Sequence, residues 1–178
     1  KTMKDLNEDE NVSEIEVQGN IPFVTSEEVS LVLIDTPGPD NARDKRHGLV
    51  TAKALDQSSK MLVMFVMNGE NLHNDAQDAF LKQIATSMRV DGKQSKERFL
   101  FVINKMDGYN EEDDDIRGET IPDTIKYLEE MGIEDPNIFP VSAQLALQIR
   151  RYWSTTDEEE KKNLYKNFEA DARKMINQ

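Results

Sequence analysis

The sequence predicts an α/β fold, a three-layer sandwich in which helices cover a mostly parallel sheet. Four short apolar runs carry this prediction, namely residues 29–35, 61–67, 99–103 and 138–141. Each run is too short for a buried helix and is rich in β-branched or aromatic residues, which is typical of strands buried on both faces. Amphipathic segments separate the four runs, and this alternation indicates βαβ units.

Composition narrows the class of protein. A chain of 178 residues has the size of one domain and is long enough to bury a core. Its formal net charge of −13 argues against nonspecific nucleic-acid binding and against a basic membrane-facing surface. The absence of cysteine excludes disulfides and thiolate metal sites. No apolar run approaches the roughly 18 residues of a membrane span, and no signal-peptide pattern is present. We therefore expect a cytoplasmic, globular protein that does not bind nucleic acid.

The remaining segments predict one edge strand and a series of helices. Residues 12–18 alternate apolar and polar side chains, which is typical of an antiparallel edge strand with one wet face. Helical spacing predicts helices over about 44–57, 75–88, 120–131, 144–153 and from 155 or 156 onward. Candidate N-caps are Thr120, with Asp123 as its partner, and Thr155 or Thr156, with Glu158 or Glu159 as partner.

The first apolar run ends in the turn Asp35-Thr36-Pro37-Gly38. This turn suits a Mg²⁺-triphosphate site, since the carboxylate of Asp35 can reach the water shell of the metal and the N–H of Gly38 can meet the terminal phosphate. One aspartate is enough, because magnesium keeps several waters and takes only one or two carboxylates. The alternative is an ordinary turn, for which Asp, Pro and Gly are the favoured residues.

A second polar motif, Asn104-Lys105-Met106-Asp107, follows the third run. In an open parallel sheet, ligands sit beyond the carboxyl ends of the strands. Asp107 could accept hydrogen bonds from a ring N–H and an exocyclic amine together, which guanine offers and adenine does not. A site built around these two donors discriminates against an analogue that lacks them by roughly four to five orders of magnitude. Asn104 would tie neighbouring loops together, and the stem of Lys105 could lie over the purine. The alternative is a strand that ends in a polar turn.

The fourth run is followed by the small residues Ser142 and Ala143. A turn of small residues at this edge would let backbone N–H groups approach a carbonyl group of the base. The three motifs thus each follow an apolar run. The 66 positions from Gly38 to Asn104 leave room for a helix, a strand and a second helix, as βαβ topology requires.

With LVLIDTPGPDNARDKRH, NKMD and IFPVSA in this order, residues 12–154 resemble a guanine-nucleotide-binding domain of the P-loop GTPase superfamily. Within the superfamily, the chain most resembles dynamin-like large GTPases of the bacterial type. The resemblance implies hydrolysis of GTP to GDP and phosphate with Mg²⁺, coupled to homo-oligomerisation and to membrane remodelling, with a peripheral membrane location through other domains. It implies that Asp35 serves the metal. The implied nucleotide contacts are Gly38, Asn104, Lys105, Asp107, Ser142 and Ala143.

Two alternatives stay open. The first is a ribosome- or RNA-associated GTPase of the same superfamily, which the charge of −13 disfavours. The second is an interaction domain that keeps the fold and binds no nucleotide. We expect residues 1–154 to form the GTPase domain and residues 155–178 to form a C-terminal amphipathic helix, packed on that domain or on a neighbouring one.

One departure from the superfamily pattern concerns the phosphate loop. The sequence contains no GxxxxGK[ST] motif: its single Gly-Lys pair, Gly92-Lys93, is followed by Gln94 and is preceded by Ser87 where the first glycine belongs. We therefore expect a GTPase domain without its first strand, phosphate loop and first helix. Such a chain would bind neither GTP nor Mg²⁺ tightly, would be inactive by itself and would have no secure catalytic residue. The resemblance places the missing strand between the first two apolar runs.

Overall fold

The computed structural model describes residues 32–36, 61–72, 75–90, 93–109 and 115–176, together with Asp5, Val12, Ile15, Val17 and Gly19. The chain forms two compact units, residues 1–35 and 36–178. The predicted helix over 44–57 and the predicted phosphate contact Gly38 lie outside the described residues.

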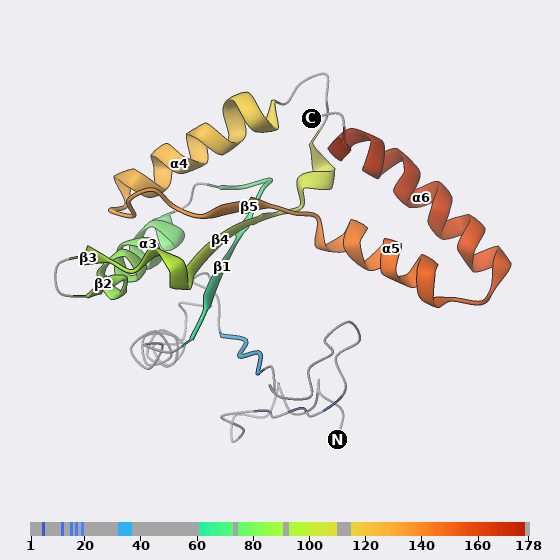
Figure 1. Cartoon of the computed structure of the whole chain (residues 1–178), viewed down its shortest axis with the longest axis horizontal. Coiled ribbons are helices and arrows are strands. Elements are labelled where there is room, and N and C mark those ends of the chain that lie inside the picture. Colours follow the sequence, from blue (N-terminus) through green and yellow to red (C-terminus); the bar gives the residue numbers. More distant parts are fainter. Residues whose placement is uncertain are drawn as a thin grey trace. The chain divides into compact units, whose positions relative to one another are not determined.

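The second unit contains a parallel sheet of three strands, β1 (Val63–Asn68), β4 (Phe99–Asn104) and β5 (Ile138–Pro140), in the order β1-β4-β5 (Figure 1). Strands β1 and β4 pair from Val63 opposite Phe99 to Asn68 opposite Asn104. The predicted α/β class with a parallel sheet is confirmed, and three of the four apolar runs form strands within two residues of the predicted bounds.

In the first unit, the predicted strand over 29–35 is wrong for its described part, because residues 32–35 belong to no strand. The side chains of Val32, Leu33 and Ile34 are 60–75% exposed. A strand is stabilised by packing and pairing with its neighbours rather than by an intrinsic backbone preference. An apolar run alone therefore does not determine a strand. Val12, Ile15 and Val17, which belong to the predicted edge strand, are also outside any strand.

Helices α3 (Asp75–Ser87) and α4 (Ile121–Glu130) pack on one face of the sheet. Side chains two residues apart on β1 and β4 point to this face, as the period of a strand requires. The core they form with the helices contains Phe65, Met67, Phe99, Phe101, Ile103, Leu81, Ile84, Met88, Tyr127 and Leu128. On the opposite face, Met64, Val66 and Phe139 are about half exposed. The sheet is thus covered on one face within the described part of the chain.

The start of α4 differs from the prediction. A π-helical turn (Ile116–Thr120) leads directly into α4, so that Thr120 already has helical backbone angles and makes no side-chain cap. The cap is Asp115, whose Oδ1 accepts a hydrogen bond of 2.6 Å from the N–H of Gly118. The predicted cap at Thr120 is therefore wrong, because the helical turns begin four residues earlier. Gly132, with φ of +90°, follows the end of α4, where a glycine relieves the strain of the left-handed conformation.

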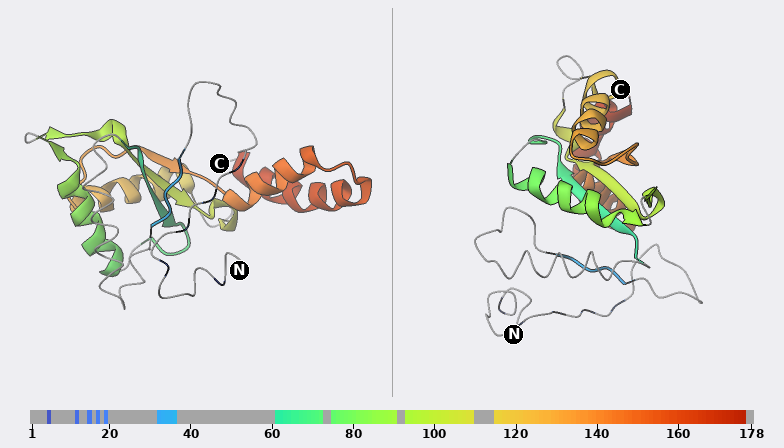
Figure 2. Two further views of the ribbon diagram at one scale, coloured as in Figure 1. Left: turned by 90° about the horizontal axis from the view of Figure 1, so that it is seen from below. Right: turned by 90° about the vertical axis from the view of Figure 1, so that its left-hand side faces the viewer.

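Helices α5 (Ala143–Ser154) and α6 (Glu158–Ile176) lie side by side (Figures 1 and 2). The rings of Tyr152 and Phe168 meet edge to face, 5.4 Å between centroids. Trp153, near the end of α5, is 79% exposed. Helix α6 also contacts the 3₁₀ turn η4 (Met106–Gly108), near the carboxyl end of β4.

The N-cap of α6 is Asp157, whose Oδ1 accepts hydrogen bonds from the N–H groups of Glu159 and Glu160. Thr155 instead donates to Glu160 Oε2 at 2.6 Å. The predicted cap at Thr155 or Thr156 is therefore wrong, because Asp157 is the residue directly before the helix. Hydrogen bonds from Thr155 and Arg151 lower the pKa of Glu160.

The rest of the described chain consists of short elements. Strands β2 (Arg89–Val90) and β3 (Lys93–Gln94) form a small antiparallel ribbon, which the 3₁₀ turn η3 (Lys96–Arg98) connects to β4. None of the helices described here is long and apolar enough to cross a membrane.

Candidate functional site

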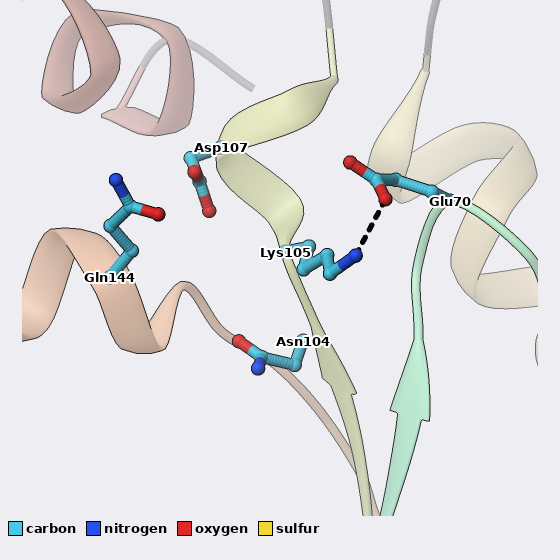
Figure 3. Close-up of a pocket in the computed structure, with 5 residues that line it drawn as sticks. All are labelled: Glu70, Asn104, Lys105, Asp107 and Gln144. Carbon is cyan, nitrogen blue, oxygen red and sulfur yellow. Dashed lines mark hydrogen bonds and ion pairs between the residues drawn. The ribbon is translucent and has the colours of Figure 1, made fainter.

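A pocket of about 360 Å³ lies at the carboxyl ends of β1 and β4, beside the start of α5 (Figure 3). Its volume is within the range typical of small-molecule sites. Its lining is polar and consists of Glu70, Asn104, Lys105, Asp107 and Gln144. The structure thus brings together three of the residues selected from the sequence, namely Asn104, Lys105 and Asp107. Ser142 and Ala143 lie directly before the fifth lining residue in the chain.

Asn104, the last residue of β4, connects the loops around the pocket. Its Oδ1 accepts a hydrogen bond of 3.0 Å from the N–H of Ala143, which holds the start of α5 against the end of β4. Its backbone oxygen accepts a hydrogen bond of 2.8 Å from the N–H of Gly69, which follows β1. Two loops distant in sequence are therefore fixed to one strand end.

Lys105 has φ of 68° and ψ of 33°, in the left-handed region. A residue with a side chain is uncommon in this region and is held there by its surroundings. The side chain runs toward Glu70 and away from Asp107 (Figure 3). Its Nζ lies 2.7 Å from Glu70 Oε2, in an ion pair with both side chains about half exposed.

Asp107 is carried by η4, and its neighbour Met106 anchors this turn. Met106 is buried in the core, and its N–H donates a hydrogen bond of 3.1 Å to the backbone oxygen of Val141. The carboxylate of Asp107 lies on the same side of the pocket as Gln144 (Figure 3). The anchored turn therefore presents a carboxylate to the pocket from a fixed backbone.

Ser142 and Ala143 position the start of α5. The Oγ of Ser142, which is 6% exposed, accepts a hydrogen bond of 3.0 Å from the N–H of Leu145 and so caps the helix. The N–H of Ala143 is engaged by Asn104. Both residues thus hold the wall of the pocket in place.

The charges of the pocket favour ligand edges that carry N–H groups. The lining carries two carboxylates, those of Glu70 and Asp107, and one ammonium group, that of Lys105. A carboxylate only accepts hydrogen bonds when it is ionised. An edge of a heterocycle that carries two adjacent N–H donors therefore matches the carboxylate of Asp107. A phosphate group at this place would meet an excess of negative charge.

The predicted metal and phosphate contacts have a different status. Asp35 is exposed in the first unit, and Gly38 lies outside the described residues. Within the part of the chain that the structure describes, no three acidic or histidine side chains cluster as metal ligands do. The assignment of Asp35 to Mg²⁺ and of Gly38 to phosphate therefore stays a prediction.

Two lining residues, Glu70 and Gln144, were missed from the sequence. Glu70 follows an Asn-Gly turn. The N–H of Glu70 donates a hydrogen bond of 3.2 Å to Oδ1 of Asn68 in this turn. Asn-Gly is a strong turn signal. Because this turn follows an apolar run of the parallel sheet, it lies at the same edge as Asn104. The position of Glu70 directly after an apolar run could therefore have identified it as a pocket residue. Gln144 could have been identified in the same way, because it lies in the first turn of the helix that follows the last apolar run.

Comparison with known proteins finds similarity to proteins named GTPase Era. The relatives from two strains of Borreliella burgdorferi and one of Borreliella afzelii are each 25% identical over 146 residues, which cover 81% of this chain and 42% of the relative. The chain thus spans less than half the length of these relatives. No family model matches, and no solved structure matches significantly. The similarity supports placement in the P-loop GTPase superfamily, with which the parallel α/β sheet agrees, and gives no support to a dynamin-like type.

Proposed function

We propose that this chain recognises the guanine base in a GTPase of the P-loop superfamily. The observation that carries the proposal is the meeting of Asn104, Lys105 and Asp107 in one pocket at the carboxyl ends of parallel strands. Ligands of open α/β sheets bind at this edge. The similarity to proteins named GTPase Era supports the same class of ligand.

In the proposed complex, Asp107 accepts hydrogen bonds from the ring N–H and the exocyclic amine of guanine. Lys105 supplies a four-carbon stem against which the purine can pack, and its charge offsets one of the two carboxylates. Asn104 acts indirectly, because its bonds to Ala143 and Gly69 hold the pocket walls. Adenine would leave the carboxylate of Asp107 facing an acceptor nitrogen, and a buried or half-buried acceptor without a donor is costly.

For the whole protein we propose hydrolysis of GTP to GDP and phosphate with Mg²⁺. In this proposal the carboxylate of Asp35 binds the water shell of the metal, and the N–H of Gly38 binds the terminal phosphate. Phosphoryl transfer depends on positioning and on neutralising the charge of the phosphates. The guanine pocket would fix one end of the nucleotide and thereby orient the triphosphate. Tight binding of the triphosphate ordinarily uses a GxxxxGK[ST] loop, which these 178 residues do not contain.

The sequence motifs are compatible with two branches of the superfamily. The similarity to GTPase Era favours the alternative, a GTPase associated with ribosomes or RNA, over a dynamin-like protein. Self-association and membrane remodelling gain no support from the comparisons. The net charge of −13 still argues that the surface of this chain is not itself an RNA-binding surface. We therefore propose that any contact with RNA is made by other parts of the protein.

The variant Asp107→Asn tests base recognition. An asparagine presents one acceptor and one donor, so it should weaken guanosine binding about tenfold or more and favour xanthosine, whose ring has a carbonyl where guanine has its amine. Both nucleosides would be titrated into the ¹⁵N-labelled chain while the amide shifts of the pocket are followed by NMR. Asp123→Asn, an exposed change on α4, is the matched control. An unchanged preference for guanosine in Asp107→Asn would refute the assignment.

A further inference from the structure

The ion pair between Lys105 and Glu70 joins the ends of two strands. Glu70 follows β1 and Lys105 follows β4, and their charged groups lie 2.7 Å apart on the pocket wall. Figure 3 shows the lysine side chain running from its own backbone toward the carboxylate of Glu70. Lys105 is thus held at both ends, at its backbone oxygen by a hydrogen bond of 3.1 Å from the N–H of Gly108 and at its Nζ by Glu70.

The backbone of Glu70 is fixed to the same strand end. The neighbouring Gly69 donates its N–H to the backbone oxygen of Asn104 at 2.8 Å, and its own oxygen accepts a hydrogen bond of 2.8 Å from the hydroxyl of Tyr109. The N–H of Glu70 is bound by Asn68. The carboxylate of Glu70 therefore extends from a turn that hydrogen bonds hold in place.

We propose that Glu70 is a positioning residue that holds the stem of Lys105 in place before a guanine ring packs on it. This inference rests on the proposed function of the pocket. A free lysine side chain has many rotamers, and ordering it when a ligand binds lowers affinity. Because the ion pair orders the stem beforehand, the ligand meets a preformed surface. Glu70 itself need not contact the base.

The variant Glu70→Gln keeps the size of the side chain and an acceptor oxygen but removes its charge. Exposed ion pairs contribute little to stability, so the expected loss of guanosine affinity is about two- to fivefold. Guanosine is the appropriate probe because it is uncharged. Removal of a negative charge near the pocket would otherwise also change the repulsion of a phosphate group.

Three measurements separate positioning from a purely structural role. The first is the guanosine affinity from NMR shifts, which in the original protein should fall as salt rises from about 0.05 to 0.5 M, because salt screens the exposed pair. In Glu70→Gln it should stay constant. The second is a double-mutant cycle with Lys105→Met, in which Glu70→Gln should cause no further loss. The third is the ¹³C relaxation of the Lys105 Cε methylene, which should report a more mobile stem in Glu70→Gln.

Glu134→Gln is the matched control. Glu134 also forms an exposed ion pair, at 3.8 Å from Arg89, but it precedes β5 and so lies at the opposite end of the parallel strands. This control should leave both guanosine affinity and Lys105 mobility unchanged.

Equal affinity in Glu70→Gln and the original protein, or an equally ordered Lys105, would overturn the positioning role. If the original protein shows no guanosine binding, the proposed function fails, and the relaxation of Lys105 still decides whether Glu70 orders the lysine.

Discussion

Gly69 is the position at which the pocket should be most sensitive to a small change. A Cβ added there would lie 2.8 Å from the backbone oxygen of Asn104, and 3.3 and 3.4 Å from side-chain atoms of Tyr109 and Ile103. The nearest atom belongs to a strand that is hydrogen-bonded on both sides, so it cannot rotate away as a flexible side chain could. Gly69→Ala must therefore push the turn away from the end of β4.

The expected loss of stability follows from these contacts. Overpacking a well-packed site costs about 1–3 kcal/mol, and loss of the hydrogen bond from Gly69 to Asn104 adds about 1 kcal/mol. Alanine restricts the unfolded chain more than glycine does, and this stabilises the folded state by about 0.4–1 kcal/mol. We therefore expect Gly69→Ala to lower the free energy of unfolding by about 2 kcal/mol. With a slope of about 1–3 kcal/mol per molar urea, the unfolding midpoint should fall by about 1 M.

Gly108→Ala is the matched control in the same region. Its Cβ would meet Glu70 Oε1 at 3.5 Å, an ordinary contact, so the urea midpoint should change little. Amide shifts of Asn104 and Lys105 should move in Gly69→Ala and stay near their original values in Gly108→Ala. Equal urea midpoints for Gly69→Ala and the original protein, with unchanged shifts at Asn104, would refute the reasoning about this close approach.

Two further predictions concern the core and the activity of the chain. Burial and the hydrogen bond to Asp78 raise the pKa of Tyr127, so its hydroxyl stays a donor and links α4 to α3 at 2.5 Å. Tyr127→Phe should cost about 1–2 kcal/mol in urea unfolding, whereas Tyr165→Phe on α6 should cost much less, and equal costs would contradict the role of this bond. These 178 residues should also bind GTP no more tightly than about millimolar and should release no phosphate, because the usual lysine and nest of N–H groups around a triphosphate are absent from the sequence. Micromolar binding in calorimetry, or steady phosphate release, would show that other groups replace the phosphate loop.

The parts of the fold that could be predicted are those determined by local pattern. Strand β4 is a continuous apolar run of the right length, and its partners β1 and β5 have the same character. Because parallel strands end at one edge, the polar residues after different strands could be expected to meet. The N–H of Ala143, after β5, does donate a hydrogen bond to Oδ1 of Asn104, the last residue of β4.

The predictions that failed depend on contacts between residues distant in sequence or on the exact residue at which a helix begins. Residues 32–35 have the same apolar character as β1, yet no strand forms there, because pairing depends on a neighbour that composition does not identify. The ion pair of Lys105 and Glu70 joins residues 35 positions apart, and nothing in either local sequence specifies it. Helix caps were misassigned by a few residues, since Asp115 and Asp157 compete with nearby threonines for the same role.

The central claim is that the pocket around Asp107 recognises guanine through two adjacent donors. Titration of guanosine, inosine and adenosine into the ¹⁵N-labelled chain tests this most directly, because inosine keeps the ring N–H of guanine but lacks its exocyclic amine. We predict that guanosine shifts the amides of Asn104, Lys105 and Asp107 in a saturable way, that inosine binds several-fold more weakly, and that adenosine has no effect at these positions. Equal shifts by all three nucleosides, or shifts confined to residues outside the pocket, would contradict the account.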